Sequence, residues 1–189
     1  MKRIYALAIS MVVLLATPAL ATADITGRSA MNQQAINYVI SRALAQRGVP
    51  FSYGGGDANG PTAGNPVANA MQQPEQLSNG LDSQPLASGI AVDAAPKPIG
   101  FDASGLVLYA FAGVGIKLPR SSGEQYKVGQ KILPQQALPG DLIFYGPEGT
   151  QSVAMFLGNG QMLQATDPVV VVTPVRTNDM APYLSRMIA

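Results

Sequence analysis

The chain has 189 residues, enough for one domain with a hydrophobic core, and its 12 basic and 11 acidic residues leave it nearly neutral. That balance provides no charged surface for nucleic acid or an anionic membrane, so we expect neither as a partner. The sequence contains no cysteine and no histidine, which excludes disulfides, thiolate nucleophiles and thiolate metal sites and removes the commonest general base. We therefore expect no bound metal and no cofactor.

The first 21 residues have the features of a secretory signal peptide. Lys2 and Arg3 precede an apolar stretch from residue 4 to about residue 16, and the small-residue triplet at 19–21 follows. An N-terminal membrane anchor is the alternative, but the stretch is shorter than the roughly 20 residues that a spanning helix needs. We predict cleavage after the triplet, which leaves a secreted protein with one domain, residues 22–189, and no membrane span.

The domain is predicted to begin with a helix between Ser29 and Arg47. Ser29 is a suitable N-cap, and Gly48, followed by Val49 and Pro50, ends the pattern. A stripe of apolar residues at helical spacing predicts packing against a core. Its members are Met31, Ala35, Ile36, Val39, Ile40, Ala43 and Leu44.

Residues 51–56 read FSYGGG and lead into an unusual segment. Adjacent glycines permit backbone conformations closed to other residues and a close approach by another group, although a flexible linker is the alternative. Residues 57–98 contain six prolines and no aromatic residue, and neither a period of two nor one of 3.6 persists in them. We interpret them as a mobile insertion rich in Pro, Gly, Ala and Asn, with Gly54 and Phe101 on either side of it lying close together.

Residues 100–120, GFDASGLVLYAFAGVGIKLPR, predict a buried helix around which the chain is organised. Asp102 is a good N-cap, and Gly113 and Gly115 end the apolar run. Position 103 then falls in the first helical turn, where free N–H groups and the helix dipole would favour an ionised, nucleophilic cysteine. The residue at this position is Ala103, which has no atom able to attack a substrate.

A second, short helix is predicted to end before Gly129. Its N-cap is either Ser121, with Glu124 three residues later, or Ser122, with Gln125 three residues later. The sequence leaves both alternatives open.

Short apolar runs separated by Pro, Gly, Asn and Asp turn residues predict four strands of an antiparallel meander, at residues 141–145, 152–157, 161–165 and 169–175. The Asn159-Gly160 pair is the most specific hairpin signal. The tail from 178 to 187 predicts either a short helix or a final strand. Helices followed by a meander predict an α+β domain.

These segments resemble the NlpC-type cell-wall peptidases, a papain-like family that cuts the stem peptides of peptidoglycan. The likeness starts at FDASGL and continues through LPR-S-S-x-x-Q-Y (118–126), LPGDLIFY (138–145) and SVAMFLGNGQML (152–163), in the family's order and spacing. It extends to a non-catalytic mycobacterial member that binds peptidoglycan. The resemblance implies a papain-like domain in which N-terminal helices pack on a C-terminal antiparallel meander.

The resemblance also implies where the catalytic residues of the family would lie. The cysteine nucleophile falls on Ala103, the general-base histidine on Ser152, and the third, orienting residue at about Gln164. A methyl group cannot attack, and a serine hydroxyl accepts a proton poorly near neutral pH. The resemblance therefore implies a catalytically inactive member, a pseudoenzyme.

The resemblance implies that the chain keeps the family's peptide-binding subsite. Its implied residues are Asp102, Ser104, Arg120 and Ser122, with Phe51 and Tyr53 at the aromatic positions of the family's Y-x-W-G-G stretch. Arg120 would pair with a substrate carboxylate and Asp102 with an amino end.

Each polar residue also has a simpler interpretation. In this interpretation Asp102 does no more than cap its helix and Ser104 has a structural role. Arg120 then lies on the surface without a partner. Gln164 is solvated or hydrogen-bonded on its strand, and Asp141 fixes a turn.

The sequence thus predicts an exported, inactive family member that binds peptidoglycan or its stem peptides. One alternative is a regulator or decoy partner of an active cell-wall hydrolase. Another is a hydrolase with a non-standard nucleophile, Ser104 or Ser152, but neither serine has a histidine or an obvious lysine beside it in the sequence. An unactivated serine is a poor nucleophile.

Overall fold

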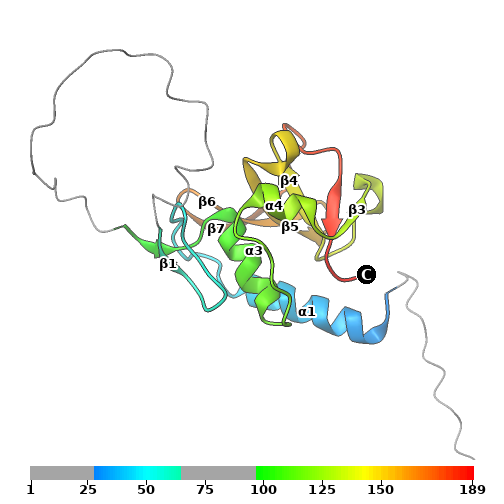
Figure 1. Ribbon diagram of the computed structural model, residues 1–189, viewed down its shortest axis with the longest axis horizontal. Coiled ribbons are helices and arrows are strands. Elements are labelled where there is room, and N and C mark those ends of the chain that lie inside the picture. The colour runs from blue at the N-terminus through cyan, green and yellow to red at the C-terminus, as the bar shows by residue number, and fades with distance from the viewer. Residues whose placement is uncertain (1–27, 65–96) are drawn as a thin grey trace, which may run out of the picture.

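The computed structural model describes residues 28–64 and 97–189 (Figure 1). The predicted signal peptide, residues 1–21, and most of the predicted insertion lie outside the described residues. Within the two described ranges, no helix combines the length and the apolar character needed to cross a membrane.

The fold is α+β, as predicted, with helices on one face of an antiparallel sheet (Figure 1). Helix α3 (Ala103–Ala112) packs between α1 (Ala30–Leu44) and strands β5 and β6. The sheet has the strand order β3-β8-β4-β5-β6-β7. Its strands are β3 (Gln130–Ile132), β4 (Leu142–Tyr145), β5 (Ser152–Gly158), β6 (Gln161–Thr166), β7 (Val169–Pro174) and β8 (Leu184–Arg186).

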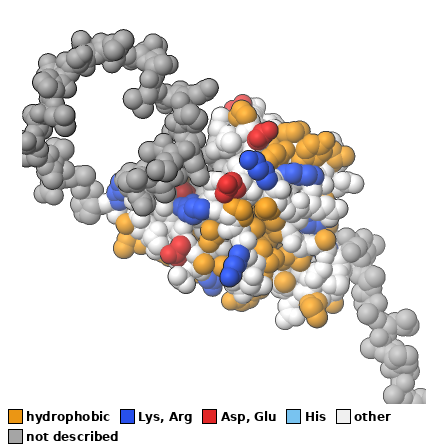
Figure 2. All heavy atoms as spheres, in the orientation of Figure 1, with side chains coloured by type: hydrophobic (Ala, Val, Ile, Leu, Met, Phe, Trp, Pro, Cys, Tyr) orange, Lys and Arg blue, Asp and Glu red, His pale blue; other side chains and the backbone are white. Residues whose placement is uncertain are grey.

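The sheet is apolar on both faces because its strands contain consecutive apolar residues, and successive side chains project to opposite faces. On β4, Leu142 and Phe144 join the core beneath the helices, whereas Ile143 and Tyr145 join a second cluster on the opposite face. Phe101 and the apolar residues of α3 complete the first core. On the face seen in Figure 2, basic and acidic side chains of the described residues are interspersed.

The predicted helices form, and the structure decides what the sequence left open. Ser29 caps α1 by accepting a hydrogen bond from the backbone N–H of Asn32. Met31, predicted to face the core, is instead 79% exposed, because it lies in the first turn, ahead of the first buried position, Ile36. Helix α4 (Ser122–Lys127) has Ser121 as its N-cap.

The four predicted strands are confirmed as β4, β5, β6 and β7, which pair in sequence order. Asn159 and Gly160 both have positive φ, 49° and 68°, as a tight β-hairpin turn requires. The tail ends in a strand, β8, and not in a helix. It pairs between β3 and β4, and the short strand β3 was not predicted at all.

The first residues of the predicted insertion, 57–64, belong to the fold, which corrects the interpretation of residues 57–98 as a mobile insertion of low structural content for this part of the segment. Strand β1 (Thr62–Ala63) pairs with β2 (Ile99–Gly100). The carboxylate of Asp57 accepts hydrogen bonds from the N–H groups of Asn59 and Gly60. The central part of the segment, residues 65–96, lies outside the described residues.

A buried carboxylate, that of Asp141, joins three distant segments. Its Oδ1 accepts from Nη2 of Arg28 at 2.9 Å and from Nε of Arg186 at 2.9 Å, and its Oδ2 accepts from Nη2 of Arg186 at 2.8 Å. The N–H of Leu138 also donates to Oδ2, so the predicted turn is confirmed. The hydrogen bond to Asp141 raises the pKa of Arg186, whereas burial lowers the pKa of Arg28. This cluster fixes the segment before α1 to β8 and to the turn before β4.

Replacing this carboxylate should destabilise the fold strongly. In Asp141→Asn the two arginines keep their charges in a buried place without a counter-ion, which typically costs about 3 kcal/mol or more. Urea denaturation of the variant should show that loss in the free energy of unfolding. Asp179→Asn, a change of the same size and charge at an exposed position with positive φ, is the control. Equal effects of the two changes would contradict the role given to Asp141.

Candidate functional site

The N-terminus of α3 forms the centre of the candidate site. Asp102 has extended backbone angles, φ −89° and ψ 176°, and its Oδ1 accepts a hydrogen bond of 2.6 Å from the N–H of Gly105. This is the predicted N-cap. Ala103 is therefore the first residue of the helix, with its methyl group packed against the core beneath the helices.

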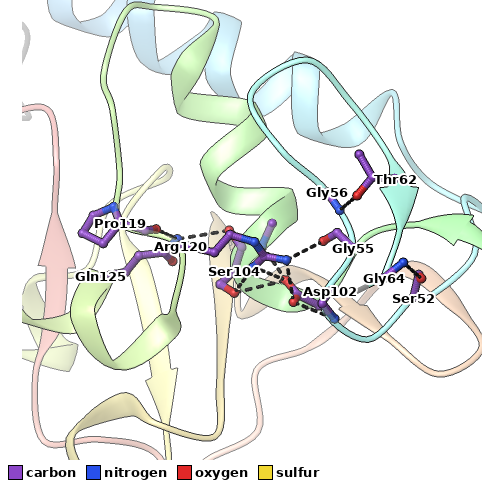
Figure 3. A network of polar contacts seen from close by, with 12 residues as sticks. Ser52, Gly55, Gly56, Thr62, Gly64, Asp102, Ser104, Pro119, Arg120 and Gln125 are labelled. Atoms are coloured by element: carbon purple, nitrogen blue, oxygen red, sulfur yellow. Dashed lines mark hydrogen bonds and ion pairs between the residues drawn. The ribbon is translucent and has the colours of Figure 1, made fainter. Parts of the chain in front are cut away.

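Arg120, on the segment that leads into α4, reaches back to Asp102 (Figure 3). Its Nη1 and Nη2 donate to the two carboxylate oxygens of Asp102, at 2.9 and 2.8 Å. Nη1 also donates to Oγ of Ser104, and Nη2 to the carbonyl of Gly55, both at 2.9 Å. The simpler interpretation of Arg120 as a surface residue without a partner is wrong, because it holds a two-pronged ion pair with Asp102.

The glycine-rich loop is fixed against the same carboxylate. The N–H of Gly54 donates to Oδ2 of Asp102 at 3.1 Å, and the N–H of Asp102 donates to the carbonyl of Gly55 at 3.0 Å. A Cβ added to Gly105 would lie 2.2 Å from that carbonyl oxygen, so a residue with a side chain does not fit there. The loop is thus ordered, not a flexible linker, and the predicted proximity of Gly54 and Phe101 is realised through Asp102, the next residue.

A residue that sequence reasoning missed ties α4 to this cluster. Gln125 is fully buried, and its Nε2 donates to the carbonyls of Ser104, at 3.0 Å, and of Pro119, at 2.8 Å (Figure 3). Its place in a candidate capping box and in the LPR-S-S-x-x-Q-Y motif predicts neither its burial nor these bonds. Its tertiary role depends on a turn between α3 and α4 that no spacing rule predicts.

The other residues implied for binding differ in their access to solvent. Tyr53 is 53% exposed and directly precedes Gly54, whose N–H donates to Asp102. Phe51 is half-buried and packs on the core, and its backbone forms a bridge with Phe101. Ser122 is buried at the start of α4. Of the two aromatic residues, Tyr53 is the one suited to contact a ligand.

Ser152 and Gln164 lie on neighbouring strands of the sheet. Ser152 begins β5, which packs against α3, and is paired with Tyr145 of β4. Gln164 lies on β6, where its Oε1 accepts from Nη1 of Arg176 and its Nε2 donates to Oγ1 of Thr173 at 3.1 Å. Both ends of the Gln164 amide are therefore used within the protein.

Within the described residues, no group of three or more acidic side chains is placed to hold a metal ion. The side chains of Asp102, Ser104 and Arg120 bond to one another at the start of α3. We call this bonded group, together with the backbone of Gly54 and Gly55, the Asp102 cluster; it lies beside a small apolar surface at Ala103.

Comparison with known proteins gives consistent matches. The model of the NlpC/P60 family matches residues 48–188. The peptidoglycan endopeptidase RipA of Mycobacterium tuberculosis is 48% identical over 158 residues, which make up 82% of this chain and 28% of RipA. The chain spans about a quarter of the length of the RipA relatives and about half of the length of the peptidoglycan endopeptidase RipB of M. tuberculosis.

Two solved structures carry further information. RipD of M. tuberculosis, described as a non-catalytic NlpC/p60 domain protein with an adaptation to peptidoglycan-binding function, is 54% identical with a TM-score of 0.65, covering 82% of this chain and 98% of that one. RipA mutated at a cysteine is 47% identical with a TM-score of 0.65, and the match covers 82% of this chain and 63% of the RipA chain. RipA has also been solved with a histidine and with a glutamate mutated. The three mutated positions are separated by the same two intervals as Ala103, Ser152 and Gln164.

The Asp102–Arg120 pair should contribute measurably to stability. Asp102→Ala removes the helix cap and the charge-assisted bonds, at an expected cost of about 2 kcal/mol in the free energy of unfolding. Because Arg120 is partly exposed, with 38% of its side chain accessible, we expect a coupling energy of only about 1 kcal/mol. A double-mutant cycle with Arg120→Ala, followed by urea denaturation, measures it. Additive effects of the two changes would refute the coupling.

Proposed function

Because the chain belongs to the NlpC/P60 family, we propose that it binds the stem peptides of peptidoglycan in the cell envelope and does not cut them. The observation that carries this proposal is the methyl group of Ala103 at the first position of α3. The helix N-terminus would stabilise the thiolate form of a cysteine at this position. In this chain the same capped, glycine-lined N-terminus surrounds a residue that cannot react.

The chemistry of a cysteine peptidase also lacks a base in this chain. The chain contains no histidine, and we assign the base position to Ser152, which has no activating partner of that kind. We assign the orienting position to Gln164, whose amide is bonded to Arg176 and Thr173. The matching intervals in RipA support both assignments. Loss of the nucleophile or the base of a triad lowers the rate by about 10⁴ to 10⁶, and this chain lacks both.

A serine nucleophile is disfavoured by the bonding around Ser104. Its hydroxyl donates to Oδ1 of Asp102 at 3.1 Å and accepts from Arg120, and the residue is 8% exposed. A hydroxyl bonded on both sides and closed off from solvent is poorly placed to attack a peptide.

The Asp102 cluster beside Ala103 supports a binding role. Asp102 and Arg120 neutralise each other, so we propose that with Ser104 and Ser122 they fix the shape of the peptide subsite. The exposed ring of Tyr53 and the exposed part of Arg120 would then contact the ligand. A surface that is already rigid loses little conformational entropy on binding, which favours affinity. The binding described for RipD, at 54% identity, supports the same conclusion.

Incubation with purified sacculi tests the proposal directly. We expect the protein to co-sediment with the sacculi and to release no muropeptides, as measured by chromatography of the supernatant. Cleavage products from the unmodified protein would overturn the proposal, and so would a lack of co-sedimentation.

The Ala103→Cys/Ser152→His double variant extends this experiment, with each single variant as its control. Muropeptide release by the double variant alone would support the assignment of the two positions, since a thiolate and its base act as a unit.

Tyr53 should contribute directly to binding. Tyr53→Ala removes an exposed aromatic ring beside the proposed subsite, and the amount bound to sacculi should fall by about tenfold, as for an aromatic contact worth about 1–2 kcal/mol. Tyr183→Ala is the matched control, because Tyr183 is similarly exposed, at 43%, and precedes β8 at the other end of the sheet. Equal binding of the two variants would place the ligand away from Tyr53.

A further inference from the structure

The guanidinium of Arg176 is held in a defined place although the residue is exposed. Its central carbon lies 3.7 Å from the centre of the Tyr145 ring, and its Nη1 donates to Oε1 of Gln164. The backbone carbonyl of Arg176 accepts from the Tyr145 hydroxyl at 3.3 Å. Tyr145 and Gln164 are only 2% and 7% exposed, so a buried platform supports an accessible cation.

This cation lies on the sheet face that carries the two assigned catalytic positions on the strands. Ser152 is the register partner of Tyr145, and directly opposed residues of an antiparallel pair project to the same face. Gln164, on the next strand, bonds to the guanidinium itself. Arg176 thus lies beside the positions where the base and its orienting residue would act.

Arg176 also differs in its charge balance from Arg28, Arg120 and Arg186. Arg28 and Arg186 share the carboxylate of Asp141, and Arg120 is paired with Asp102. Among the described residues, no carboxylate lies within ion-pair distance of Arg176, although Asp179 follows three residues later. Its guanidinium has five N–H donors, of which the structure uses one for a side chain.

We infer that Arg176 is a carboxylate-binding residue on the strand side of the peptide site, beside Ser152 and Gln164: its guanidinium, stacked on Tyr145 and oriented by Gln164, pairs with a free carboxylate of the stem peptide. This inference rests on the proposed function and assigns to Arg176 the role that the sequence assigned to Arg120. Arg120 gives the donors of both its terminal nitrogens to the protein's own atoms, whereas Arg176 retains donors and an uncompensated charge. A planar, fixed guanidinium matches the geometry of a carboxylate.

Calorimetric titration of the purified protein with a synthetic stem tetrapeptide tests the inference. One peptide carries free carboxylates, and a second has the same sequence with its carboxylates amidated. Arg176→Gln should weaken binding of the acidic peptide by about tenfold, the factor expected for one charge-assisted contact, and leave binding of the amidated peptide unchanged. Arg176→Lys keeps the positive charge but not the planar guanidinium, so its affinity for the acidic peptide should fall by a smaller factor than that of Arg176→Gln.

Arg47→Gln is the matched control, since it removes the same charge from an exposed position just beyond α1. If Arg176→Gln binds the acidic peptide as well as Arg47→Gln does, or loses the same factor for both peptides, the inference is overturned. It is also overturned if the wild type binds sacculi but not the acidic peptide. If the wild type binds neither, the proposed function fails together with it.

Discussion

The carboxylate of Asp102 holds together the three segments that form the candidate site. It accepts five hydrogen bonds, which come from the glycine-rich loop, the first turn of α3 and the guanidinium of Arg120. None of these bonds involves the side chain of residue 103. The hydrogen-bonded geometry of the site therefore does not depend on the side chain at position 103.

Two carboxylate–arginine clusters connect different segments of the domain. The Asp102 cluster joins the loop, α3 and the approach to α4, whereas the Asp141 cluster joins the segment before α1 to β4 and β8. In both, a mostly or fully buried acid is bonded to arginine, so each cluster resists separation. Arg176 lies outside both clusters, and this separates a cation suited to recognition from the cations used for structure.

Local signals in the sequence predicted most of the fold. The caps at Ser29 and Asp102 and the Asn159-Gly160 turn depend on neighbouring residues alone, and all three are confirmed. Strand β3 was not predicted because three residues carry too little periodicity. The bonds of Gln125 and Arg176 were missed because they depend on how distant segments meet. Whether Ser152 and Gln164 occupy catalytic positions remains a prediction carried by the family resemblance.

The position of β8 has a consequence for how the polypeptide reaches its native state. Residues 184–186 pair between β3 and β4, so those two strands have no direct partnership of their own. Translation delivers the N-terminal parts first. The sheet consequently stays divided until residues 184–186 have been synthesised, so the joining of β3 to β4 through β8 is a late step of folding.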